Sequence, residues 1–187
     1  MRPRNRLAET ILAALHDPSA RDELLALART PEGQLPAGWL ASGEERHAEK
    51  LVGRARCAAL ALGRHARGRP DPPLDEALAA AATLFDAGLY FEVHELLEPY
   101  WRQTAGASRE ALQGLIQIAV GYQHLANGNL DGARALLAEG ATRVRQGQLP
   151  GLDLARFAFD VEALQRRFPH IDTADVPAFP RAPRSGG

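Results

Sequence analysis

One short stretch of the sequence concentrates the side chains that could do chemistry. His94, Glu95 and Glu98 fall within five consecutive residues of an alanine- and leucine-rich chain. On a helix, which turns about 100° per residue, these three share one arc of about 120° with Phe91 and Trp101. Because the arc carries two aromatic residues, we expect it to be the packed face. It would then direct one imidazole and two carboxylates toward the interior.

Two neighbours of this group carry separate expectations. Glu92 lies well away from the arc, so its carboxylate is expected to face solvent. Pro99 follows Glu98 and has no amide hydrogen to continue a helix. We therefore expect the helix to end early at Pro99, with a new turn at Tyr100; the alternative is a kink that aims the carboxylates.

A second polar stripe lies further along the chain. Gln113, Gln117 and His124 follow one another at helical spacing, with Gly114 and Gly121 on the flank, where a neighbouring helix could approach closely. If the two helices pack antiparallel, their stripes face each other. The cluster predicted in this way comprises His94, Glu95, Glu98, Gln113, Gln117 and His124, with Trp101 and Tyr122 as walls.

Burying carboxylates without partners would cost several kcal/mol each, so the cluster must be compensated. A divalent metal could be bound by His94, Glu98 and His124, with positions left open for water and with Glu95 as general base. A closed hydrogen-bond network, or a metal-free binding pocket, would also compensate the charges. The motif His-Glu-x-x-Glu differs from the His-Glu-x-x-His of zinc proteases, and all three interpretations stay open.

The elements that must position these residues are predicted to be helices. Apolar periodicity and Gly or Pro breaks predict an all-α, multi-helix bundle built from packed helix hairpins. Gly88 is expected to cap a helix in the left-handed conformation. We predict a helical N-terminal extension over 1–70, a bundle core over 71–168 and a Pro-rich tail over 169–187 that is extended or disordered. The predicted helices span 6–15, 20–29, 43–65, 74–87, 90–102, 109–126, 130–145 and 154–167.

Composition limits the class of protein. The 187 residues include 35 Ala and 27 Leu, one cysteine, and a formal net charge of −1. No intramolecular disulfide can form, and no apolar window is long enough for a transmembrane helix, so we expect a cytoplasmic protein without a membrane partner. Five arginines and no acid lie between Arg54 and Arg69, whereas 71–101 holds seven acids and no Lys or Arg. The sequence leaves a homo-oligomer open and gives little support to a nucleic-acid partner.

The motifs resemble those of domain-of-unknown-function family 309, whose bacterial and archaeal members are small, all-helical and labelled predicted metal-dependent hydrolases. The likeness covers roughly 74–145 and implies importance for Glu92 and Trp101 beside the cluster already described. The departures are Pro99 and the extra residues 1–70, which could cover or complete the site. The resemblance rests on Phe85-x-x-Gly88-x-Tyr90-x-Glu92-x-His94-Glu95-x-Leu97-Glu98-x-x-Trp101, Leu112-Gln113-Gly114-Leu115-Ile116-Gln117-x-Ala119 and His124-x-x-x-Gly128-Asn129-x-x-Gly132-Ala133.

Two functions follow as hypotheses. The first is a metal-dependent hydrolase that acts on a small polar substrate, with His94 and Glu95 in catalysis. The second is a non-enzymatic interaction module. It rests on a weak internal repeat, in which Gly88 and the residues after it align with Gly128 and the residues after it, 40 positions further on. Such helix hairpins resemble tetratricopeptide repeats, and the polar cluster would then be a fully buried structural network.

Overall fold

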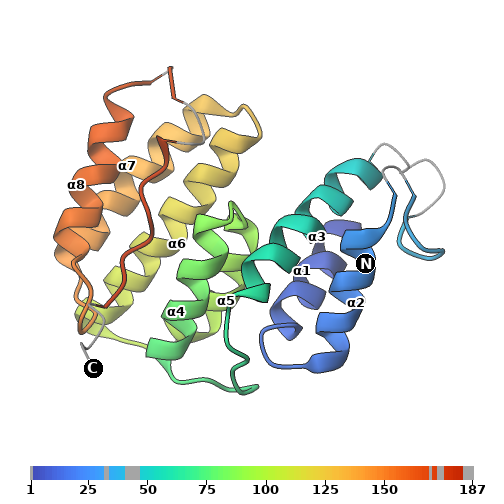
Figure 1. Ribbon diagram of the computed structural model, residues 1–187. Coiled ribbons are helices and arrows are strands. Elements are labelled where there is room, and N and C mark those ends of the chain that lie inside the picture. The colour runs from blue at the N-terminus through green and yellow to red at the C-terminus, as the bar shows by residue number, and fades with distance from the viewer. Residues whose placement is uncertain (1, 32–33, 41–46, 169, 172–174, 183–187) are drawn as a thin grey trace.

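The protein is a bundle of helices. The computed structural model describes residues 2–31, 34–40, 47–168, 170–171 and 175–182, and within these ranges every regular element is a helix (Figure 1). The predicted all-α class is therefore confirmed. The helices are α1 (Pro3–Ala13), α2 (Pro18–Arg29), α3 (Ala48–Gly63), α4 (Leu74–Asp86), α5 (Tyr90–Gln103), α6 (Gly106–Ala126), α7 (Leu130–Gln146) and α8 (Leu154–Gln165).

The helices form two groups that lie side by side. Helices α1, α2 and α3 pack on one another, and α4 to α8 form the larger bundle (Figure 1). The most extensive helix contact is between α6 and α7, and α5 packs on α6 from the other side. The first group meets the bundle mainly where α1 contacts α5 and where α3 contacts α4. Helix α5 therefore lies between α6 and the N-terminal helices.

Most helices end near the Gly or Pro breaks that were predicted from the sequence. Gly88 lies in the turn after α4 with φ +73°, and Gly128 lies in the turn after α6 with φ +77°. The predicted left-handed conformation at Gly88 is therefore confirmed. Helix α6 begins at Gly106, three residues earlier than predicted.

The expected break at Pro99 is wrong, because α5 continues through it to Gln103. Partners outside the helix hold this last turn. The Tyr100 hydroxyl donates to the Pro72 carbonyl at 2.7 Å, and Arg109 stacks on the Trp101 ring at 4.2 Å.

Glycines on α6 and α7 let these two helices approach closely. A Cβ atom built on Gly114 would lie 2.7 Å from the Gly140 carbonyl oxygen, and one on Gly121 would lie 2.8 Å from the Leu137 side chain. Real Cβ contacts are not this short, so only glycine fits. The close approach expected of Gly114 and Gly121 is thus present, and the partner helix is α7.

The linker is hydrogen-bonded to the N-terminal group, and the C-terminal segment is hydrogen-bonded to the bundle. The Gly68 amide donates to the Leu15 carbonyl, at the start of the connection between the two groups. Residues 176–182 carry no helix and run back to α4 (Figure 1), where the Phe179 amide donates to Asp86 at 2.9 Å and the Phe179 ring is buried. Of the helices in the described ranges, none combines the length and the hydropathy that crossing a membrane requires.

We predict that Gly114→Ala destabilises the protein by about 1–3 kcal/mol, because the new methyl group meets backbone atoms of α7. Urea denaturation followed by circular dichroism measures the free energy of unfolding. Gly53→Ala is the matched control, since Gly53 lies inside α3 with open space around it. That change should stabilise the protein by about 0.5–1 kcal/mol. Equal effects of the two substitutions would contradict the close α6–α7 packing.

Candidate functional site

The packed face of α5 is not the one that the aromatic residues suggested. Its buried side chains are Tyr90, Glu92, Val93 and Leu97, so the expectation that the arc of His94 and its neighbours faces the interior is wrong. The reason lies with the aromatic residues on that arc. Phe91 and Trp101 are only partly buried, and each is covered by a guanidinium group, from Arg4 at 4.1 Å and from Arg109 at 4.2 Å. Cation–π stacking lets them lie at the surface.

His94, Glu95 and Glu98 form a compact group on the half-exposed face of α5. One ligand atom from each residue can be chosen so that all three lie within 4.8 Å of one another. Their side chains are 30%, 40% and 30% exposed. The group is therefore open to solvent and to ligands, whereas a purely structural network was expected to be fully buried.

Hydrogen bonds orient the imidazole within this group. His94 Nδ1 lies 3.0 Å from Glu95 Oε1, and His94 Nε2 lies 3.9 Å from Glu98 Oε2. Because a carboxylate only accepts hydrogen bonds, Nδ1 is the donor and a neutral ring presents the Nε2 lone pair toward Glu98. The other oxygen of Glu98 accepts from Arg102 Nη2 at 2.6 Å. This arrangement leaves one nitrogen and one carboxylate oxygen facing each other without a hydrogen bond between them.

Glu92 is the residue that the helical pattern placed least well. It was expected to face solvent, but its side chain is fully buried. Arg54 Nη2 of α3 donates to both of its carboxylate oxygens, at 2.7 Å and 2.5 Å, and Arg54 itself is only 15% exposed. The N-terminal helices cover this side of α5, and a buried carboxylate is retained there because a cation is supplied with it.

The polar stripe of α6 does not join the group on α5. The Gln117 amide hydrogen-bonds Glu139 of α7, and this bond, with that from Arg143, lowers the pKa of Glu139. The His124 ring bonds the Asn129 side chain at 2.8 Å, at the turn into α7. His124 is not among the residues that could share a metal ion with His94, and Gln113 lies half-buried on the same stripe. The polar stripe of α6 thus lies toward α7, because the glycines of α6 allow α7 to pack closest to it.

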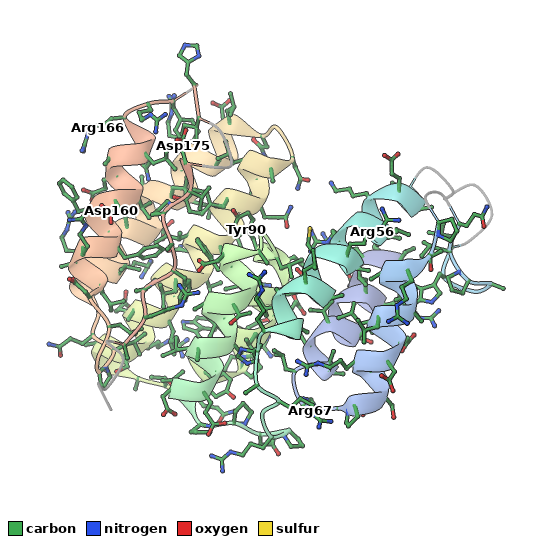
Figure 2. The ribbon with its side chains drawn as sticks, in the orientation of Figure 1. Arg56, Arg67, Tyr90, Asp160, Arg166 and Asp175 are labelled. Carbon is green, nitrogen blue, oxygen red and sulfur yellow. The ribbon has the colours of Figure 1, made fainter. Side chains whose placement is uncertain are left out.

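Trp101 and Tyr122, the two aromatic residues expected to line the cluster, also lie in different places. Tyr122 lies in the core, with its ring 5.7 Å from those of Phe85 and Tyr90. Burial raises the pKa of Tyr90 to about 12 and raises that of Tyr122 as well, so both phenols are neutral at ordinary pH. Figure 2 labels Tyr90 among the bundle helices. Trp101 stays near the motif face, where its Nε1 is buried without a hydrogen-bond partner among the described residues.

A cavity of about 560 Å³ adjoins Glu95 and is bounded by α1, the linker and the second half of α5. Glu9 comes from α1 and His16 from the turn that follows it, whereas Leu96, Pro99 and Tyr100 come from α5. Contributions from residues 9 and 16 were not predicted, because no local motif marks them. Residues of the 1–70 segment thus form part of the wall of this cavity.

The fold and this geometry define a small all-helical protein with a half-exposed His/Glu group on one bundle helix. Residues 78–136 match the model of a family described as "Domain of unknown function (DUF309)", which confirms the resemblance seen in the motifs. The matched region contains every candidate residue from Glu92 to His124.

The chain is also similar to the "Uncharacterized protein YpuF" of Bacillus subtilis (strain 168). The two sequences are 34% identical over 93 residues, which cover 46% of this chain and 51% of the relative. The chain thus spans about half the length of the curated relative that it matches. No solved structure matches the chain at a significant level.

We predict that Glu92→Gln destabilises the protein by about 3–5 kcal/mol, because it leaves the Arg54 charge largely buried without a counter-ion. Thermal and urea unfolding measure the effect. Glu162→Gln is the control, since Glu162 pairs with Arg145 at 2.6 Å on the surface, where such pairs contribute about 0–1 kcal/mol. A loss for Glu92→Gln no larger than that of the control would show that the pair is not structurally important.

Proposed function

We propose that the protein binds a divalent metal ion through the His94, Glu95 and Glu98 group and hydrolyses a small polar substrate beside it. The observation that carries this proposal is the convergence of three potential ligand atoms within 4.8 Å on a half-exposed helix face. One imidazole and two carboxylates form a donor set that suits ions such as Zn²⁺ and Mn²⁺. With His94 and Glu98 as ligands and Glu95 beside them, coordination positions stay open for water or substrate.

The separation of the donor atoms fits a shared ion. Two atoms that each lie about 2 Å from one metal are at most about 4 Å apart. His94 Nε2 and Glu98 Oε2 lie 3.9 Å apart, within that limit and beyond hydrogen-bond distance. Small rotations of the two side chains would bring both atoms to coordinating distance.

Each side chain then has a distinct role. Glu95 holds the imidazole through Nδ1, which keeps Nε2 free as a ligand atom. Arg102 fixes the Glu98 carboxylate through its other oxygen. A divalent ion, when bound, supplies a Lewis acid that acidifies a water molecule. The Glu95 carboxylate can accept the proton of that water, and the cavity bounded by α1 and α5 offers space for a substrate next to it.

The half-exposure of the group favours this proposal over the interaction module. A module built on a structural network needs the cluster to be buried and satisfied, whereas the three side chains are 30–40% exposed. The helix hairpins whose turns contain Gly88 and Gly128 fit either function equally well. The accessible ligand atoms therefore support a metal site more than a buried structural network.

We expect the purified, chelator-treated protein to take up about one Zn²⁺ or Mn²⁺ per chain in equilibrium dialysis, measured by elemental analysis. His94→Ala and Glu98→Gln should each reduce this uptake at least tenfold, because each removes a ligand atom. Glu162→Gln is the matched control: its carboxylate is 30% exposed and paired with an arginine, like Glu98, but it lies on α8. It should leave uptake unchanged.

The same samples test hydrolysis on a panel of chromogenic ester and phosphoester substrates. At saturating metal, Glu95→Gln should lower kcat by about 10²-fold or more, since it removes the proton acceptor. Uptake of neither ion by the wild-type chain, or equal uptake by wild type and His94→Ala, would refute the metal site. Uptake without metal-dependent hydrolysis of any substrate class would refute the hydrolase.

A further inference from the structure

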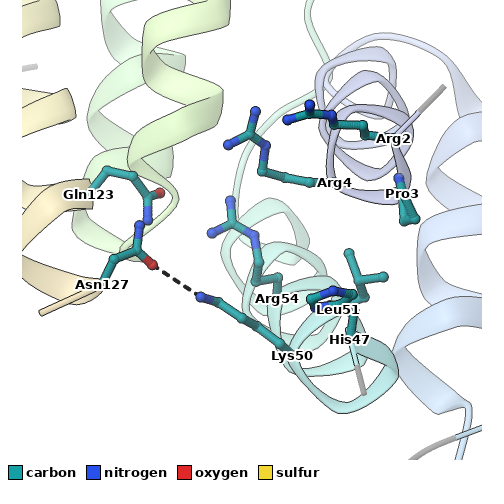
Figure 3. A pocket seen from close by; sticks show the side chains of 9 residues that line it. All are labelled: Arg2, Pro3, Arg4, His47, Lys50, Leu51, Arg54, Gln123 and Asn127. Carbon is teal, nitrogen blue, oxygen red and sulfur yellow. Dashed lines mark hydrogen bonds between the residues drawn. The ribbon is translucent and has the colours of Figure 1, made fainter. Parts of the chain in front are cut away.

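A second cavity, of about 350 Å³, lies where the N-terminus of α1, the first half of α3 and the C-terminal end of α6 meet. Figure 3 shows three guanidinium groups and one ammonium group projecting into this space from the start of α1 and from α3, opposite two side-chain amides at the end of α6. The polar lining includes Arg2, Arg4, Lys50, Arg54, Gln123 and Asn127. No acidic side chain is among the described residues that line it.

Lys50 and Arg4, two of the exposed cations, have neutral groups as partners. Lys50 Nζ donates to the Asn127 amide oxygen at 3.1 Å (Figure 3), which bridges α3 and α6. Arg4 donates to the Asn5 amide oxygen at 3.3 Å and stacks on the Phe91 ring. Neither contact neutralises a charge. Several positive charges are thus held close together, an arrangement that an anion would stabilise.

Among the cationic side chains that line this cavity, Arg54 is held in a fixed position. Its Nη2 is committed to Glu92, which neutralises that carboxylate and holds the guanidinium in place. Its Nε is buried and has no hydrogen-bond partner among the described residues, and the same is true of Gln123 Oε1. Arg54 and Gln123, which both line the cavity, thus carry polar atoms without a partner among the described residues, which is uncommon in a folded protein.

We propose that this cavity binds a small molecule through a phosphate group. Arginine forks match the oxygens of a phosphate and can donate two hydrogen bonds at once, and a lysine adds a point charge. The volume is that of a small-molecule pocket, and Leu51 and Pro3 offer apolar surface to an organic moiety. None of the residues of the His94, Glu95 and Glu98 group lines this cavity, so the binding goes beyond the proposed function and does not require a metal.

Isothermal titration calorimetry with sodium pyrophosphate, on the full chain in EDTA, tests the proposal. We expect saturable binding of one pyrophosphate per chain, weakened by added salt. The double variant Arg4→Gln/Lys50→Gln should bind at least tenfold more weakly, since it removes two charge-assisted contacts. Both side chains are exposed, so the variant should fold, which circular dichroism verifies.

The control is Arg64→Gln/Arg166→Gln, which removes the same charge from exposed positions outside the cavity. Arg64 follows the opposite end of α3 from Lys50, and Arg166 follows the C-terminal end of α8 (Figure 2). It should bind pyrophosphate within about twofold of wild type if the contacts are local.

Three results would overturn the proposal. These are an absence of saturable binding at millimolar pyrophosphate, equal weakening by the two double variants, and at least tenfold tighter binding of a twelve-nucleotide single-stranded DNA through the same two residues. The last result would assign the surface to a nucleic-acid backbone.

Discussion

The buried ion pair between Arg54 and Glu92 is the constraint on which this face of the protein depends. It joins α3 of the N-terminal group to α5 of the bundle, with Glu92 fully buried and Arg54 nearly so. Two ions at such a position have lost most of their hydration, so each is tolerable only while the other is present. The N-terminal helices must therefore stay against α5 for the bundle to keep Glu92 buried.

The Arg54–Glu92 pair holds the N-terminal group against one side of α5, and the faces of this helix have different roles. Tyr90, Val93 and Leu97 fill the core, whereas His94, Glu95 and Glu98 lie on the half-exposed face. On this side of α5 the N-terminal group adds Arg4 over Phe91 and supplies walls to the cavity next to Glu95. Arg54 itself lines the second, cationic cavity. One buried contact thus organises both candidate sites, which share no residue.

The elements were predictable from local signals, but the packing faces were not. Gly88 and the helix around His94 follow from turn chemistry and apolar periodicity, which act within a few residues. The inward face of α5 was misassigned because Phe91 and Trp101 are stabilised at the surface by arginines from other helices. Partners from other helices leave no pattern within α5 itself. The burial of Glu92 had an indirect sign, since an acid-free arginine run begins at Arg54 and is followed by a stretch of acids without cations.

A double-mutant cycle on Arg54 and Glu92 tests the central claim most directly. The free energy of unfolding is measured by urea denaturation for wild type, Arg54→Met, Glu92→Met and the double variant. We predict a coupling free energy of at least about 1.5 kcal/mol, with the double variant more stable than the sum of the single losses implies. Losses that add to within about 0.5 kcal/mol would contradict it, because the two side chains would then stabilise the protein independently.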